Sequence, residues 1–114
     1  MNHSYLADLC SQLPGTTEDI KWDNDLCYSV GGKMYCVVSL SSPFTVSFKV
    51  TPEQFTLLTS RHGIEPAPYL ARHYWVLITD VEALTKSEWE KSINRSYQLV
   101  YARLPKKLRE KLNH

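Results

Sequence analysis

Cysteine and histidine are both scarce in this sequence, and their spacing limits the chemistry that the chain can perform. There are three cysteines and four histidines in 114 residues. An odd number of cysteines without a CxxC pair indicates neither a zinc site nor a set of disulfides, so we expect three reduced thiols. The sequence contains no HExxH motif, no GxSxG motif and no Cys–His arrangement. It therefore predicts a non-catalytic protein that uses neither a metal nor a cofactor.

Glycine-rich loops, long apolar runs and a secretion signal are also missing. The Gly31-Gly32 pair stands between two strand-like segments, whereas a phosphate-binding loop needs a helix behind its glycines. No apolar run approaches the roughly 18 residues of a membrane-spanning helix. Residues 1–15 lack the basic stretch and the apolar core of a secretion signal. We therefore expect a cytoplasmic protein that is not inserted in a membrane.

A large excess of charge of one sign is absent as well. The net charge of the chain is only +1. Residues 103–114 contain five Lys or Arg and one Glu, a net charge of +4, which leaves −3 for residues 1–102. The main part of the chain thus lacks the overall positive field of a strongly basic protein. Any anion-binding site has to be a local cluster of basic side chains.

What the chain does contain is the composition of an ordinary globular domain. Hydrophobic residues make up 43% of it and charged residues 22%, a balance that is typical of globular and not of disordered proteins. A domain of this length buries roughly two-thirds of its unfolded surface, which is enough for one core without disulfides. We expect a single domain over residues 1–114 that is a monomer.

Hydrophobic periodicity predicts an α+β fold. Apolar residues recur at helical spacing near both ends of the chain and once in the middle, and between residues 18 and 50 the period switches to two. Thr51, Pro52 and Gln54 form a strong helix-start signal. The expected order is helix, antiparallel β-meander, helix, strand and long C-terminal helix. The helices are expected at 4–13, 51–63 and from Thr85 or Ser87 to Leu104, with one more basic turn at 106–112, and the strands at 18–22, 26–30, 33–40, 44–50 and 73–79.

The Gly31-Gly32 turn predicts the register of the central hairpin. A two-residue loop places Cys27 opposite Cys36, and a second loop at residues 41–42 would place Val46 opposite Val37. One face of the sheet is then rich in large apolar side chains and should pack against the helices, while the other is exposed or half covered. The expected core face carries Leu26, Tyr28, Val30, Tyr35, Val37, Phe44, Val46 and Phe48, and the opposite face carries Cys27, Ser29, Met34, Cys36, Val38, Thr45, Ser47 and Lys49.

Basic residues with aromatic neighbours occur at the expected strand ends and in the loops beside them. Such side chains could contact a phosphate backbone, but an ordinary solvated surface gives the same pattern. The loop 64–72 is expected to be extended, because Pro66 and Pro68 disfavour helix in the residues before them. It leads directly into an apolar strand, so we expect Trp75 in the core, and we expect Trp22 there as well.

Five segments spread over residues 4–108 together resemble one known family. They are K-W at 21–22, G-K-M-Y-C at 32–36, S-F-K-V-T-P-E at 47–53, P-A-P-Y-L-A-R-x-x-W-V at 66–76 and S-Y-Q-L-V at 96–100. In combination they resemble the MmcQ/YjbR-like proteins, also called the DUF419 family. The resemblance implies a compact α+β domain in the order given above, similar to secretion-chaperone-like folds and loosely to frataxin. It also implies DNA binding through a double-wing surface, in which hairpins lie on either side of a helix.

The resemblance also implies a set of DNA-contacting residues. Lys21, Lys49, Tyr69 and Trp75 match the family pattern position by position, with Trp75 as the anchor of its strand. Four further residues are added because they lie near these in the sequence. The expected DNA-binding residues are therefore Lys21, Lys49, Arg61, His62, Tyr69, Arg72 and His73.

Two hypotheses for the function follow. The first is a non-catalytic protein that binds DNA weakly and largely without sequence specificity. The second is a protein-interaction or chaperone-like adaptor that does not bind nucleic acid. A continuous positive surface around Lys21, Lys49 and Arg72 would favour DNA, and an apolar patch on the open face of the sheet would favour a protein partner.

Overall fold

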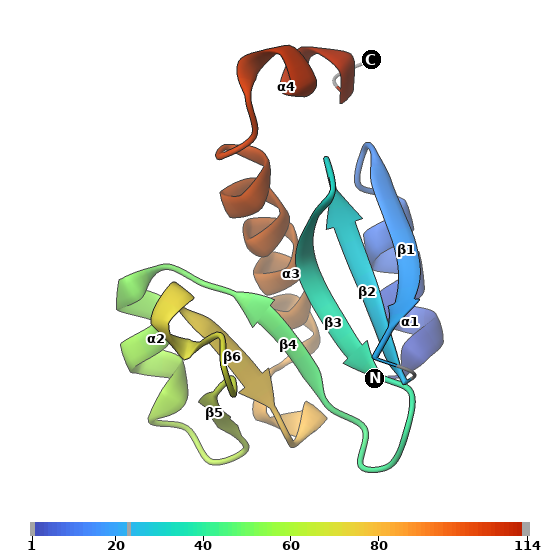
Figure 1. The fold of residues 1–114 in the computed structure, drawn as a ribbon. Helices are drawn as coiled ribbons and strands as arrows, with labels where there is room; N and C mark the ends of the chain where they lie inside the picture. The colour runs from blue at the N-terminus through green and yellow to red at the C-terminus, as the bar shows by residue number, and fades with distance from the viewer. Residues whose placement is uncertain (1, 23, 113–114) are drawn as a thin grey trace.

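A computed structural model describes residues 2–22 and 24–112 of the chain (Figure 1). The described residues form a six-stranded antiparallel sheet in the order β1-β2-β3-β4-β6-β5. The predicted α+β order is confirmed, with one added strand, β5, in the proline-containing loop. The elements are α1 (His3–Ser11), β1 (Thr16–Lys21), β2 (Asp25–Val30), β3 (Lys33–Ser39), β4 (Val46–Lys49), α2 (Pro52–Thr59), β5 (Ile64–Pro66), the 3₁₀ turn η1 (Ala71–His73), β6 (Trp75–Ile78), the 3₁₀ turn η2 (Val81–Ala83), α3 (Lys86–Tyr101) and α4 (Lys106–Leu112).

Helices cover one face of the sheet and leave the other face open. α1 and α3 lie behind β1 to β4, and α2 packs against β5 and β6 (Figure 1). The Thr85 hydroxyl and the Glu88 carboxylate form the capping box that starts α3. From there, the buried face of α3 presents Trp89, Ile93 and Tyr97 to the sheet. α1 begins at His3, one residue earlier than expected, because the side chain of Asn2 caps it.

The predicted register of the central hairpin is correct at the turn and wrong beyond it. Ser29 lies opposite Met34 as expected, but a β-bulge inserts Tyr35, so that Cys36 pairs with Tyr28 and no longer with Cys27. Both Tyr35 and Cys36 therefore reach the helix side, where they are fully buried. The Tyr35 hydroxyl forms a hydrogen bond with the Thr16 hydroxyl at 2.8 Å, and this bond favours the inward orientation of the Tyr35 ring.

The bulge moves every later partner of β3 by one residue. Val46 pairs with Val38, where Val37 was expected, and Phe48 pairs with Cys36. Since neighbours in a pairing row share a face, Cys36 and Val38 belong to the core and Val37 faces the open side, contrary to the prediction. The faces expected for β2 and β4 stand.

The sheet opens between β3 and β4, and a serine from α3 joins the two strands there. The last backbone pair between them is Cys36 with Phe48. One residue further along, the Lys49 amide donates to the Ser96 hydroxyl (2.9 Å), and this hydroxyl donates to the Tyr35 carbonyl (2.6 Å). Figure 1 shows the two strands diverging toward the α4 end, with α3 visible between them. The Ser96 hydroxyl thus takes the place of a direct backbone hydrogen bond between β3 and β4.

Candidate nucleic-acid interface

A hollow with basic walls lies where β3 and β4 separate. It has a volume of about 460 Å³. Four basic side chains from four parts of the chain line it: Lys33 from β3, Lys49 from β4, His73 from η1 and Arg103 just after α3. The rest of its lining is apolar, namely Met34, Leu70, Trp75, Val100 and Leu104. No acidic side chain among the described residues lines this hollow.

The positive charges in this hollow are close enough to disfavour one another. The Lys49 ammonium donates to the His73 carbonyl oxygen at 2.6 Å, which holds the lysine against η1. Partial burial lowers the pKa of Lys49, and the nearby Arg103 guanidinium lowers it further. A bound anion would relieve this repulsion, so the hollow is electrostatically suited to a negatively charged group.

The structure brings together only part of the predicted set of basic residues. Lys49 and His73 share the hollow, and Arg72 is exposed beside His73 in η1. Sequence reasoning missed Lys33 and Arg103 as members of this site. No local signal in the sequence marks Arg103, because it follows the end of α3 and its place beside Lys49 depends on how α3 crosses the sheet.

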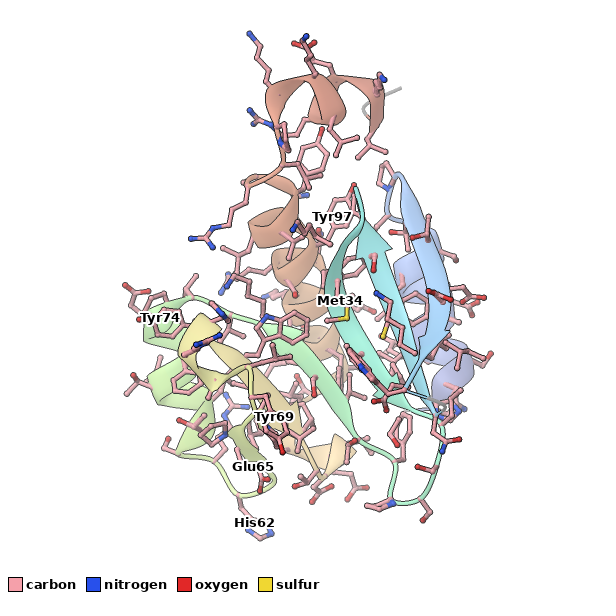
Figure 2. All side chains as sticks on the ribbon, viewed as in Figure 1. Met34, His62, Glu65, Tyr69, Tyr74 and Tyr97 are labelled. Carbon is pink, nitrogen blue, oxygen red and sulfur yellow. The ribbon has the colours of Figure 1, made fainter. Side chains whose placement is uncertain are left out.

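Lys21 and His62, two of the predicted basic residues, lie elsewhere. Lys21 sits three strands and four residue positions from Lys49, about 20 Å away for strand spacings near 4.8 Å and a rise near 3.3 Å per residue. His62 follows α2 at the end of β6 opposite to η1, and Figure 2 places it at the far lower end of the molecule. DNA binding was expected to use a continuous positive surface around Lys21, Lys49 and Arg72. Lys21 lies too far from the other two to belong to it.

Arg61 is engaged in an ion pair on another side of the molecule. Its guanidinium donates two hydrogen bonds to the Glu88 carboxylate, at 3.1 and 2.7 Å. This pair raises the pKa of Arg61 and, with the backbone of Thr85, lowers the pKa of Glu88 to about 2. The charge of Arg61 is thus balanced, and we no longer count it among the phosphate contacts.

A second hollow, here called the aromatic groove, crosses the open face of the sheet. It has a volume of about 500 Å³. Tyr69 and Trp22 line it and are 96% and 65% exposed. The expected core position of Trp22 is therefore wrong: this residue follows β1 with a left-handed backbone (φ 51°), which leaves its ring outside the core. Trp75 is buried, as predicted. The remaining lining residues are Asp25, Met34, Val37, Ser47, Ala67, Pro68 and Leu70.

Neither a cluster of metal-ligating side chains nor a membrane-spanning helix is found among the described residues. Within 2–22 and 24–112 there is no group of three or more His, Cys, Asp or Glu that could hold a metal ion. None of the helices in these ranges is both long and apolar enough to cross a bilayer. The three cysteines are unpaired and buried.

These features define a class of protein, a small α+β domain with helices on one sheet face and two hollows on the other. The chain belongs to the YjbR family, whose model matches residues 11–99. It is similar to the crystal structure of the Deinococcus radiodurans protein DR2400, a DUF419 protein, with a TM-score of 0.86 and 27% identity over 96% of this chain and 86% of that one. A Pseudomonas syringae crystal structure, structural genomics target PsR293, has the same fold, with a TM-score of 0.72 and 20% identity over 88% of this chain and 99% of that one. No curated protein matches the chain.

Proposed function

We propose that this protein binds DNA without catalysis, through the basic hollow formed by Lys33, Lys49, His73 and Arg103. The observation that supports this proposal is the convergence of these side chains on one hollow whose described lining has no acidic member. Arg72 extends the same positive surface from η1. The turn between β2 and β3 and the loop between β5 and β6 act as the two wings, with the end of α3 between them.

The proposed binding is weak and largely independent of sequence. The hollow offers three or four contacts, and phosphate contacts position a protein without reading bases. Each neutralised phosphate contributes about −0.9 to the slope of log affinity against log salt. Four contacts thus lower the affinity roughly a hundredfold between 50 and 200 mM salt.

Fluorescence anisotropy with a labelled mixed-sequence duplex at low salt tests the proposal. Arg103→Ala and Lys33→Ala should each weaken binding to all duplexes alike and flatten the salt slope by about one unit. Lys91→Ala is the matched control, because it removes the same charge from an exposed position of α3 that does not line the basic hollow. The absence of saturable binding up to about 100 μM, the weak end of the usual non-specific range, would contradict the proposal.

A second candidate function is that of a protein-interaction adaptor. The observation that favours it is the aromatic groove, which presents an apolar lining and two exposed aromatic rings on the open face. This candidate predicts no saturable DNA binding, and it predicts that binding of a protein partner depends on Trp22 and not on Arg103.

A further inference from the structure

We infer that the aromatic groove receives unpaired bases of a single-stranded nucleic acid whose phosphates lie on the basic hollow. This inference rests on the proposed function and specifies its ligand. The two hollows share Met34 and Leu70 in their linings, so they form one continuous surface. Figure 2 shows Met34 and Tyr69 on the same side of the molecule, in front of the sheet.

The exposure of the two aromatic rings fits stacking with bases. Trp22 lies in the turn between β1 and β2, and Tyr69 in the loop between β5 and β6, so the rings come from opposite borders of the sheet. Between them, Val37 and Ser47 of the central strands form the floor of the groove. Proteins that bind single strands combine such aromatic platforms with a positive track for the backbone.

The distribution of charge on this surface indicates which end of it faces the phosphates of the nucleic acid and which faces the bases. The basic hollow carries the cations, whereas the aromatic groove is lined by one carboxylate, that of Asp25, and by no basic side chain among the described residues. A carboxylate repels phosphate but accepts hydrogen bonds from the amino groups of bases. The phosphates therefore belong at the Arg103 end and the base edges at the Asp25 end.

A duplex cannot use this surface in the same way. Its base faces are stacked inside, so Trp22 and Tyr69 would meet only sugar and phosphate. The Asp25 carboxylate would then lie next to phosphate groups, which is unfavourable. An apolar peptide could fill the groove, but it would make no use of the four basic side chains at the other end, and its binding would not depend on salt.

The test compares a labelled twelve-base single strand of mixed sequence with the twelve-base-pair duplex that it forms with its complement, in the same low-salt buffer. We expect tighter binding of the single strand. Trp22→Ala and Tyr69→Ala should each lower its affinity about fivefold to a hundredfold, the range of stacking on one aromatic ring, and leave duplex binding unchanged. The control is Ile20→Ala, which removes an exposed apolar side chain (59% exposed) from the other face of β1.

Tryptophan fluorescence gives a second readout. Of the three tryptophans, Trp75 and Trp89 are buried and only Trp22 is exposed for stacking, so most of the quenching by the single strand reports on Trp22 and should be lost in Trp22→Phe. Duplex binding that equals single-strand binding, with both aromatic variants unaffected, would overturn the inference and leave the proposed function standing. If neither the single strand nor the duplex binds, both the inference and the proposed function are overturned. Trp22-dependent binding of an apolar peptide, with no single-strand binding, would assign the groove to a protein partner.

Discussion

Ser96→Ala removes one hydroxyl from the junction of α3, β3 and β4, and the structure predicts a large loss of stability. The Ser96 side chain is fully buried, accepts from the Lys49 amide and donates to the Tyr35 carbonyl. Without it, a part-buried N–H and a buried C=O lose their partner at a place where no backbone pair joins β3 and β4. Each unpaired group costs about 1–3 kcal/mol. Allowing for partial relaxation, we expect the free energy of unfolding to fall by about 2–4 kcal/mol.

Thermal and urea denaturation measure this loss. Globular proteins gain about 2.1 cal/mol/K of unfolding entropy per residue, or about 0.24 kcal/mol/K for this chain, so the melting temperature should fall by about 8–17 °C. The urea midpoint should fall by about 1–2 M at an unchanged slope.

Ser92→Ala is the matched control. Ser92 lies one turn earlier in α3, is half-buried, and no hydrogen bond of its side chain is seen among the described residues. Since alanine is the better helix former, this variant should stay within about 0.5 kcal/mol of the parent protein. A fall of less than about 3 °C for Ser96→Ala would refute the reasoning, because it would mean that the two strands satisfy these groups without the hydroxyl.

Three further predictions concern the core, the thiols and the ion pair. Trp75→Ala should lose about 3–5 kcal/mol and fail to fold or melt far below the parent protein, since this ring is 6% exposed; an unchanged melting temperature would argue against its burial. All three cysteines should be alkylated when the protein is unfolded with the alkylating agent present, because none of them forms a disulfide in the structure; a mass deficit of two hydrogens would disprove this. Glu88→Gln should destabilise by about 1 kcal/mol, because the pair with Arg61 is partly exposed. The folded pKa of Glu88, about 2, is below the unfolded value near 4.3, so its stabilisation is present above about pH 5 and lost as the pH falls toward 2. The difference in melting temperature between variant and parent should shrink over that range.

Local signals explain why most elements could be predicted. Thr51 and Thr85 cap helices in the structure as their neighbours in the sequence indicated. β5 was missed because three residues with a proline carry almost no periodic pattern; only pairing with β6 makes them a strand. The position of Trp22 was wrong for a similar reason: hydrophobicity predicts burial, but the turn after β1 directs this ring outward.

The residues of the candidate site also include some that the sequence could predict and some that it could not. The sequence pointed to Lys49 and His73, which flank two strands that meet side by side. It could not select Lys33 and Arg103, because their approach to Lys49 depends on how α3 crosses the diverging strands. It also could not exclude Arg61, whose charge is balanced by a carboxylate 27 positions away.

The sequence by itself determined the family, the order of the helices and of every strand except β5, and the buried strand that begins at Trp75. Caps, turns and apolar period act over a few neighbouring residues, which is why they can be read locally. Only the tertiary structure decided the register of β3, the junction at Ser96 and the membership of the basic hollow. The physical reason is the range of the interactions. Tyr35 turns inward because it contacts Thr16 and Tyr97, and one inserted residue then changes which side chains of β3 face the helices and which face the open side of the sheet.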